Sequence, residues 1–490
     1  MSALDPRTPV IAGVGQVTVR DGGPDLDRTP LAMMQAAVEA AGADAGTTAL
    51  LGEARLWIAS AGVFRYTDPA RLVAHRWGVV EAQTRLTNFG GNLPQAALAH
   101  VAASIGAGEL DVGVVLGGEA DRNRRLLAAS GEHLDSTGPD EQPAPRFGSE
   151  TPIPNEIELA VGAGVPAVSY ALFESALRAE RAETLAENTR ILGELWAGFA
   201  DVARHNRHAW NREGDDAARI PAISADNRMV ATPYTKAMCA NPQVDMGAAV
   251  IVCSLERARR HGVDESQLVF PCSSATGHDT VELLARDALH TSHAIAPTGA
   301  AALAHAGLGI DDLAHVDLYA CFPSIVRMTA TALGLAHDRP LTVTGGLNYG
   351  GGPLNNATLH AVATMVERLR ADPTAHGLVH GNGGMATKHS IGVYSAVPPA
   401  QPFADLDAQS DIDHRARVPA PDHEGEATVA AATVIHDRDG PTAALAVLTT
   451  PDGGRAFARS AAPDVLEAVT TSETVGRSGR RLADGTLVLD

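Results

Sequence analysis

The chain has 490 residues, of which 45% are hydrophobic and 20% are charged, and its formal net charge is −20. This length suits roughly two or three domains, and the acidity argues against a nucleic-acid partner, which usually needs a basic face. The 4 cysteines show no CxxC spacing, so we expect a reduced, cytoplasmic protein without disulfides or a metal site. The sequence shows no pattern of a signal peptide and no run apolar enough to predict a membrane span.

The first part of the chain alternates between predicted strands and helices. Hydrophobic runs predict buried strands at residues 9–17, 55–63 and 112–116. Helical patterns lie between them at residues 29–41 and 70–77. This alternation indicates an α/β fold with a mostly parallel sheet whose faces are covered by helices.

A glycine turn at Gly90-Gly91 leads from a predicted strand end into a predicted helix. Apolar residues recur at every fourth position of that helix, at Leu93, Ala97, Val101 and Ile105. A turn of this kind brings free N–H groups and the positive end of the helix dipole to one point. Such an elbow often carries a nucleophile or an oxyanion site.

The pattern changes after residue 120. Residues 131–156 are rich in Gly, Pro, Asp and Glu and predict a loop. Helices are predicted at residues 169–179 and 182–206, the second of them long and amphipathic. The run at residues 232–254 then predicts a return into the core.

The order of glycine turn, helix, strand and Gly-Gly turn occurs a second time in the later part of the chain. The helices and strands expected there fall at residues 291–307, 315–319, 322–335, 354–369, 377–380 and 389–395. We interpret this recurrence as an internal duplication.

The composition shifts again near the end of the chain. Several prolines and charges at residues 398–422 predict a linker. Beyond it, at residues 423–490, short β-branched runs are separated by Asp-Gly and Gly-Gly turns, which is typical of hairpins. We expect a small antiparallel barrel there, similar to the oligonucleotide-binding type in shape alone.

The pattern ALxxxxxxIxxGExDVxxxxGGE at residues 97–119 resembles the nucleophile elbow of the thiolase superfamily. Asp245, Gly247 and Ala248 match a DGAAA-like run of the sterol-carrier-protein-2 (SCP2) thiolase subgroup. The chain is similar to actinobacterial thiolase-like proteins of type 1, often labelled acetyl-CoA acetyltransferase. The resemblance covers residues 5–397.

The resemblance implies a duplicated five-layer αβαβα core. Its N-terminal half would cover residues 1–260, with a loop domain inserted at about residues 121–245, and its C-terminal half residues 261–397. In thiolases this inserted domain covers the active site and holds coenzyme A. The same resemblance implies acyltransferase chemistry in lipid metabolism.

The resemblance also places the family's catalytic positions on this chain. Gly91 stands where thiolases carry the nucleophilic cysteine, and His380 stands where they carry the acid/base cysteine. Tyr319, in LYACFPS, takes the place of a histidine, and Gly352, in GGLNYGGGPL, that of the GHP histidine. We therefore expect neither thiolysis nor Claisen condensation.

Other residues on these loops remain candidates for chemistry. His380 suits a general base near neutral pH, or a histidine satisfied by backbone. Cys321 is the cysteine on a site loop, although a buried apolar role is commoner. Asn348 is a candidate oxyanion donor, although Asn also tolerates turn backbone. Four basic residues of the insertion are candidates for binding coenzyme A phosphates: Arg122, Arg124, Arg125 and Lys236.

Two functions stay open on this basis. One is a protein that binds an acyl-CoA, without a tightly bound cofactor, and carries out other acyl chemistry. The alternative is a non-catalytic scaffold whose C-terminal barrel binds a protein partner. An open polar pocket at the four site loops favours the first, and a filled one favours the second. Both a monomer and a thiolase-like dimer fit the sequence.

Overall fold

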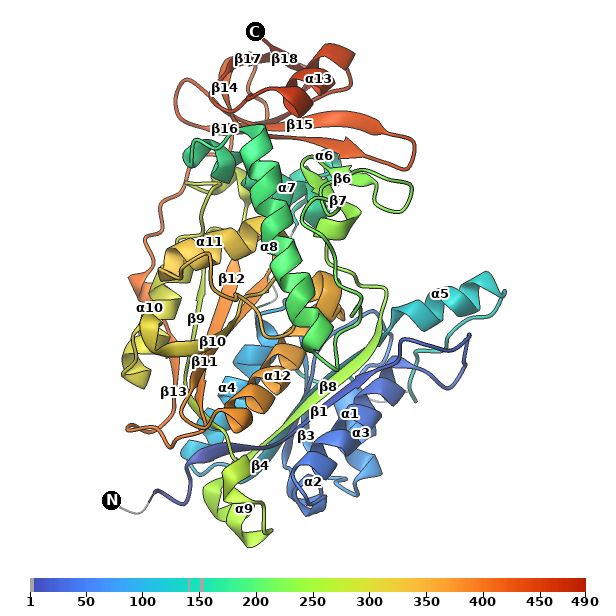
Figure 1. Ribbon diagram of the computed structural model, residues 1–490, viewed down its shortest axis with the longest axis vertical. Helices are drawn as coiled ribbons and strands as arrows, with labels where there is room; N and C mark the ends of the chain where they lie inside the picture. The colour runs from blue at the N-terminus through green and yellow to red at the C-terminus, as the bar shows by residue number, and fades with distance from the viewer. Residues whose placement is uncertain (1–3, 140–141, 150–153) are drawn as a thin grey trace.

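The computed structural model describes residues 4–139, 142–149 and 154–490. Two sheets with helices between and outside them form the body, and a third sheet lies at one end (Figure 1). Among the described residues, no helix is long and apolar enough to cross a membrane.

The first sheet has the strand order β1-β8-β4-β2-β3-β5. β8 runs antiparallel to both of its neighbours, and the remaining pairs are parallel. Its strands are β1 (Pro9–Thr18), β2 (Leu56–Ala59), β3 (Gln83–Thr87), β4 (Val112–Ala120), β5 (Arg146–Phe147) and β8 (Asp245–Ser254). β4 and β8 are buried along their whole length, as continuous apolar runs require.

The second sheet has the order β10-β11-β12-β9-β13. β12 runs antiparallel to both β9 and β11, and β11 runs parallel to β10. The first sheet shows the same series, because β8 runs antiparallel to both β1 and β4, and β4 runs parallel to β2. The expected duplication is therefore present. The strands are β9 (Phe270–His278), β10 (Leu313–Asp317), β11 (His376–Gly383), β12 (Lys388–Ser395) and β13 (Ala404–Asp407).

Two helices fill the space between the sheets. α4 (Leu93–Gly106) and α12 (Ala357–Ala371) each contact strands of both sheets and each other. Most residues of α4 are buried, because a helix between two sheets has little solvent face, and only the stripe of Ala96, His100 and Ala103 is half-buried before the exposed last residue. The single apolar stripe expected from the sequence therefore understates its burial.

The outer helices complete the five layers αβαβα. Against the first sheet lie α1 (Pro30–Asp44), α2 (Ala49–Glu53) and α3 (Pro69–Arg76), and beside the second lie α10 (Ile295–Ala306) and α11 (Pro323–Leu333). Thr29 and Asp68 cap α1 and α3, each followed by proline in the first turn. The short helix α9 (Leu255–Arg260) follows β8.

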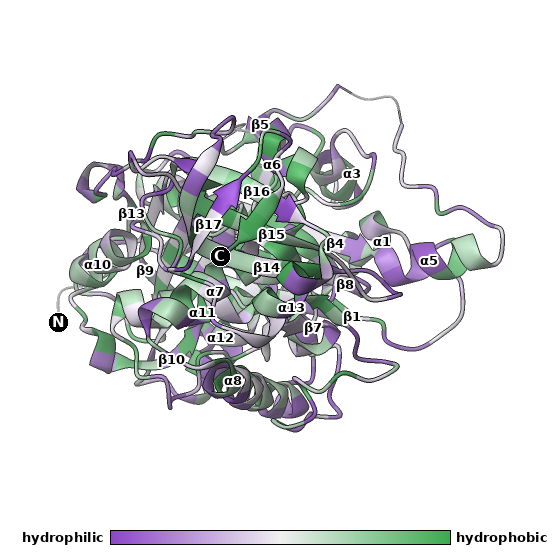
Figure 2. Cartoon of the chain, turned by 90° about the horizontal axis from the view of Figure 1, so that it is seen from above, coloured by the Kyte–Doolittle hydropathy of each residue, from purple (hydrophilic) through white to green (hydrophobic). Residues whose placement is uncertain are grey.

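The segment inserted between β4 and β8 contains more structure than the sequence predicts. α7 (Pro166–Glu180) and α8 (Leu185–His205) confirm the two expected helices. The others are α5 (Asp121–Ala129), α6 (Glu156–Val161), β6 (Met229–Ala231) and β7 (Tyr234–Thr235). α5 projects from the body (Figures 1 and 2); its polar sequence gave no apolar stripe to predict it.

Short helical turns connect several of these elements. They are η1 (Lys236–Met238), η2 (Glu265–Gln267), η3 (Leu283–Ala285), η4 (Ile310–Asp312), η5 (Gly346–Gly350), η6 (Leu354–Asn356) and η7 (Gln409–Asp411). Of these, η5 is a π-helical turn and the rest are 3₁₀ turns.

The third sheet confirms the expected antiparallel hairpins. Its elements are β14 (Gly425–His436), β15 (Pro441–Thr449), β16 (Arg455–Ser460), α13 (Pro463–Thr471), β17 (Ser478–Arg481) and β18 (Leu487–Leu489). Figure 2 looks down on this sheet, in which β15 is largely hydrophobic and green. α13 packs on β14 and β15 and was not predicted. One parallel bridge, between Arg459 and Thr486, brings the last part of the chain beside β16.

The interpretation of residues 398–422 as a linker is wrong at its centre. Residues 404–407 form β13, which pairs in parallel with β9 and extends the second sheet. The prolines around it produced the linker signal, but an edge strand tolerates nearby proline. The third sheet is also joined to the insertion, because Ile435 of β14 pairs with Ala231 of β6.

Candidate functional site

The elbow between β3 and α4 is closed by an aromatic ring. A Cβ built on Gly91 would lie 2.3 Å from Oη of Tyr319 and 2.5 Å from its Cζ. Because contacts this short do not occur, position 91 has no room for a side chain beside this tyrosine. Burial raises the pKa of the Tyr319 phenol well above its usual 10, so the hydroxyl is neutral.

Tyr319 and His380 line a small cavity of about 10 Å³. Thr358 and Gly346 also line it, and Thr358 donates a hydrogen bond to the carbonyl of Gly91. The structure therefore brings together all four predicted loops: those of Tyr319, Gly346 and His380 line the cavity, and the elbow at Gly91 adjoins it through Tyr319 and Thr358. A space of this size holds about one water molecule and no substrate.

His380 is the end of a chain of buried polar groups. Its Nε2 lies 3.0 Å from Nδ1 of His389, whose Nε2 lies 3.0 Å from Oγ of Ser292 and 3.3 Å from the carbonyl of Ala386. A carbonyl only accepts, so Nε2 of His389 carries a proton and its Nδ1 accepts from His380. Nδ1 of His380 is left as an acceptor, and it has no hydrogen-bond partner.

Both histidines are neutral at physiological pH. Burial, and then the neighbouring His389, lowers the pKa of His380 well below 6.5. Burial lowers the pKa of His389 to about 3. The pair can therefore accept a proton only at a large free-energy cost, and a general-base role for His380 needs a change of environment.

Gly352 lies near the end of the glycine loop at residues 345–354, and its backbone is hydrogen-bonded to another segment of the same chain. Its N–H donates to the carbonyl of Asn241 at 3.0 Å, and a Cβ here would lie 3.1 Å from that oxygen and from the carbonyl of Leu347. A side chain at position 352 would need both oxygens to move. Gly351 has a φ of +104°, which only glycine adopts readily.

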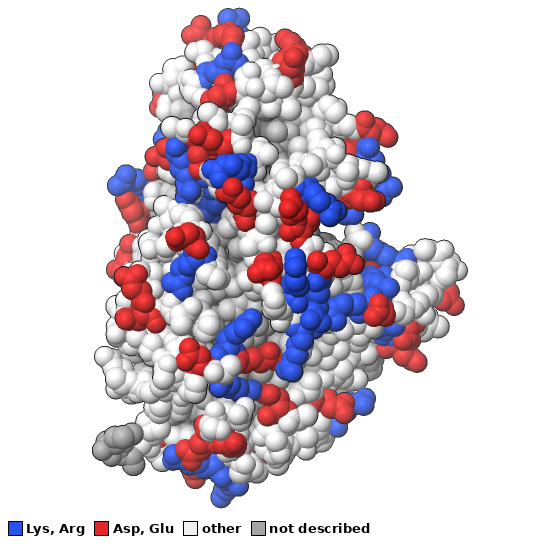
Figure 3. Space-filling model, in the orientation of Figure 1, with Lys and Arg blue, Asp and Glu red and all other residues white. Residues whose placement is uncertain are grey.

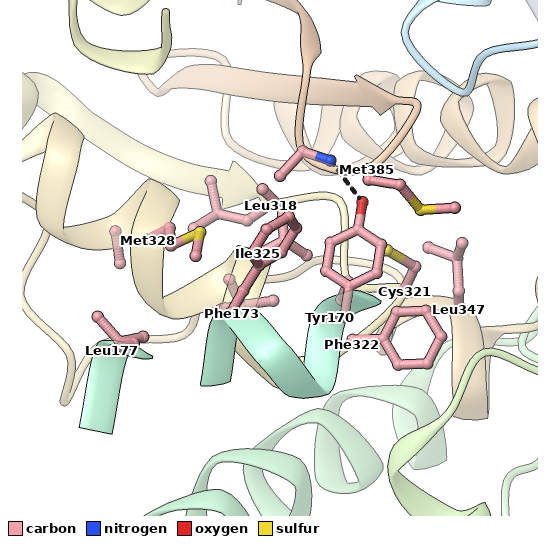
Figure 4. Packing of buried hydrophobic residues seen from close by; sticks show 14 of the residues in the cluster. Tyr170, Phe173, Leu177, Leu318, Cys321, Phe322, Ile325, Met328, Leu347 and Met385 are labelled. Atoms are coloured by element: carbon pink, nitrogen blue, oxygen red, sulfur yellow. Dashed lines mark hydrogen bonds between the residues drawn. The ribbon is translucent and has the colours of Figure 1, made fainter. Parts of the chain in front are cut away.

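Cys321 is packed among aromatic rings. Figure 4 shows its sulfur beside Tyr170 and Phe322, whose rings stack with centroids 4.8 Å apart. Oη of Tyr170 accepts from Nδ2 of Asn382 at 2.8 Å and from the Ala386 N–H at 3.0 Å. Burial raises the pKa of the Cys321 thiol to about 12, so it is protonated.

A second, open cavity of about 860 Å³ lies between the insertion and the loop at η5. Predicted residues line it: Arg122, Arg125, Lys236 and Asn348. Asn348 donates to the carbonyl of Ala237. Sequence reasoning missed Trp210 and Arg219, which also line this cavity but stand in no motif. Basic side chains gather beside α5 and the lower end of α8 on this face (Figure 3).

The candidate cations differ in their availability. Arg124 does not line the cavity and binds Asp121, which also accepts from Nε of Arg125 at 2.8 Å. Arg122 donates to the carbonyl of Gly22 at 3.1 Å. Lys236 is exposed and makes no ion pair with any residue that the structure describes.

The two cavities share no lining residue. Leu347 faces the small cavity, whereas Asn348 and Tyr349 face the open one. The η5 turn therefore separates the site of His380 from the basic cavity. Among residues 4–139, 142–149 and 154–490, no group of three or more His, Cys, Asp or Glu side chains is arranged to hold a metal ion.

Comparisons with known proteins agree with this architecture. Residues 407–486 match the sequence model of the thiolase-like protein type 1 additional C-terminal domain. No curated protein sequence matches the chain. The fold is similar to a monomeric SCP2-thiolase-like protein type 1 from Mycobacterium smegmatis, with a TM-score of 0.85 and 29% identity over 99% of this chain and 100% of that one.

More distant structures share the fold. The dimeric peroxisomal thiolase of Saccharomyces cerevisiae has a TM-score of 0.56 and 14% identity over 80% of this chain and 98% of its own. The Ltp2-ChsH2(DUF35) aldolase has a TM-score of 0.59 and 19% identity over 79% of this chain and 98% of its own. With its duplicated five-layer core and the matched C-terminal domain, the chain has the thiolase fold and is similar to a thiolase-like protein of type 1.

Proposed function

We propose that this protein binds a coenzyme A thioester in the open basic cavity and catalyses neither thiolysis nor Claisen condensation. The contact between Tyr319 and Gly91 is the observation that carries the second part. Position 91 has no nucleophile, and the ring fills the space that one would need. Removing a nucleophile typically costs several orders of magnitude in rate.

The chemistry of the open cavity supports the first part. Its volume of about 860 Å³ is in the range of cavities that bind cofactors. Guanidinium groups and an ammonium suit phosphates, and Trp210 offers a ring for stacking. These groups belong to Arg122, Arg125, Arg219 and Lys236.

The alternative, a non-catalytic partner-binding protein, is favoured by a separate observation. The cavity at His380 and Tyr319 has about 10 Å³ and cannot admit an acyl group. A ligand in the open cavity would then act as an effector and not as a substrate. We propose a monomer in either case, since the relative from Mycobacterium smegmatis is described as monomeric.

Calorimetry with coenzyme A and acetyl-CoA tests the binding proposal. We expect saturable binding that Lys236→Met and Arg219→Met weaken and that salt reduces. Arg259→Gln is the matched control, because Arg259 is an exposed cation on α9 paired with Glu265. Thiolysis of acetoacetyl-CoA by the wild type at thiolase-like rates would contradict the catalytic part. Absence of binding at millimolar coenzyme A would favour the partner-binding alternative.

A further inference from the structure

A third cavity, of about 440 Å³, lies on the α4 face of the second sheet. Leu93 and Ala96 of α4 line one side, and Phe147 lines another. Strands β9, β12 and β13 supply its floor. It shares no lining residue with the cavity at His380 or with the basic cavity, so the function proposed above does not involve it.

The strand register places three charged side chains on this floor. Lys388 pairs with His278 of β9, and Asp407 and Asp405 pair with Thr276 and Ser274. Positions two residues apart on a strand share a face. Lys388 and both aspartates therefore project to the same side of the sheet, and all three line the cavity.

Lys388 has no partner for its charge. Its side chain is 9% exposed, and it forms no hydrogen bond or ion pair with any described residue. The chain has two lysines, Lys236 and Lys388, and each lines a separate cavity. Burying an unpaired ammonium is costly, so a protein retains one where something else supplies the opposite charge.

The acidic side of the cavity also lacks a cationic partner among the described residues, and both of its carboxylates are exposed to water. Asp405 forms no hydrogen bond or ion pair with the described residues, and Asp407 accepts one from the N–H of Gln409 at 2.9 Å. With adjacent strands about 4.8 Å apart and about 3.3 Å of rise per residue, the Cα atoms of Lys388 and Asp407 are about 12 Å apart. This separation keeps the opposite charges from pairing with each other.

The end of α4 strengthens the positive side. Asn92 precedes the helix, lines the cavity and is 6% exposed. The first turn of this 14-residue helix contributes the positive end of its dipole. The cavity thus has a cationic end at Lys388 and α4 and an anionic end at β13.

We propose that this cavity binds a small organic zwitterion. Its carboxylate meets Lys388 and the N-terminus of α4, and its ammonium meets Asp405 and Asp407. Side chains stand roughly perpendicular to a sheet, so the two charged ends keep the separation of about 12 Å between their Cα atoms. With a hydrogen bond of about 2.8 Å at each end, this span suits an ω-amino acid with a few carbons between its charges.

Calorimetry with 4-aminobutanoate and 6-aminohexanoate tests the proposal, with butanoate and butylammonium as singly charged probes. We expect at least one zwitterion to bind and both singly charged probes to bind about tenfold or more weakly. Lys388→Met and the pair Asp405→Asn with Asp407→Asn each reduce binding by a similar factor. Lys236→Met leaves it unchanged, and saturating coenzyme A does not displace the zwitterion.

The two lysines allow a second readout on the wild-type sequence in case Lys388→Met fails to fold. Reductive ¹³C-methylation gives one dimethyl-lysine signal for Lys236 and one for Lys388, besides the amino terminus. The zwitterion shifts the signal of Lys388 and leaves that of Lys236 in place. Equal binding of butanoate, no binding of either amino acid at millimolar concentration, or an unshifted Lys388 signal would each overturn the proposal.

Discussion

Glu119 at the end of β4 makes the stability of the protein depend on pH. The carboxyl is 3% exposed and accepts one hydrogen bond, from the N–H of Val63 at 3.0 Å. Burial, which outweighs that bond, raises its pKa from 4.5 to about 8. The folded state therefore holds this proton while the unfolded chain has released it, and stability falls as pH rises from 4.5 to about 8.

The size of the effect follows from the shift. At pH 7, the pH is about 2.5 units above the pKa of the carboxyl in the unfolded chain, while the carboxyl in the folded state is still protonated. The free energy of unfolding is therefore about 3 kcal/mol lower at pH 7 than under acid conditions. Glu119→Gln keeps an oxygen for the Val63 N–H and removes the ionisation. We expect it to unfold at a higher temperature than the wild type at pH 8, with a smaller difference at pH 5.

Thermal unfolding of both proteins in one buffer series measures this difference. The buffers need a small enthalpy of ionisation, and reversibility is checked by a second scan. Glu53→Gln is the control, since that carboxylate is partly exposed and paired with Arg257 and His261. A difference between Glu119→Gln and the wild type that stays constant from pH 5 to pH 8 would refute the reasoning.

Three further perturbations test the packing of the site and the contact between α7 and the C-terminal part of the chain. Gly91→Ala should lower the stability of the folded protein by about 1–3 kcal/mol, because the added methyl group clashes with Tyr319. In a double-mutant cycle, Tyr319→Ala should remove that cost, whereas additive effects of the two substitutions would contradict the contact. His389→Leu should cost about 1–3 kcal/mol in chemical denaturation, because it leaves the buried Nε2–H of His380 without an acceptor and Ser292 without its donor. Arg178→Met should expose the third sheet to hydrogen exchange by removing its ion pair with Glu473, and unchanged protection would show that the pair is dispensable.

The sequence contained enough to predict the core. The repeated order of turn, helix and strand corresponds to two sheets with the same pairing series, because local pattern and duplication decide which strands neighbour each other. The hairpin turns predicted the third sheet, because a short turn places the strands on either side of it next to each other. α13 was missed, since its few turns lie among strand signals.

The site could be predicted only in part. The glycine loops located Gly91, Tyr319 and His380, but the contact between Gly91 and Tyr319 joins residues 228 positions apart (319 minus 91). No sequence pattern shows that a tyrosine ring covers a glycine or that a histidine faces another histidine. Lys388 was overlooked because its significance comes from burial without a partner, which only packing reveals.

The pairing of β6 with β14 affects the order in which the chain can fold. Ala231 of β6 can pair only after Ile435 of β14 has been synthesised, 204 residues later in the sequence (435 minus 231). At about 5–20 residues per second, a ribosome needs roughly 10–40 s to make that stretch. During synthesis the insertion over the basic cavity therefore has an unpaired strand edge, and the last-made sheet completes it. A truncated product lacking the third sheet would carry that edge permanently, as a site for aggregation or chaperone binding.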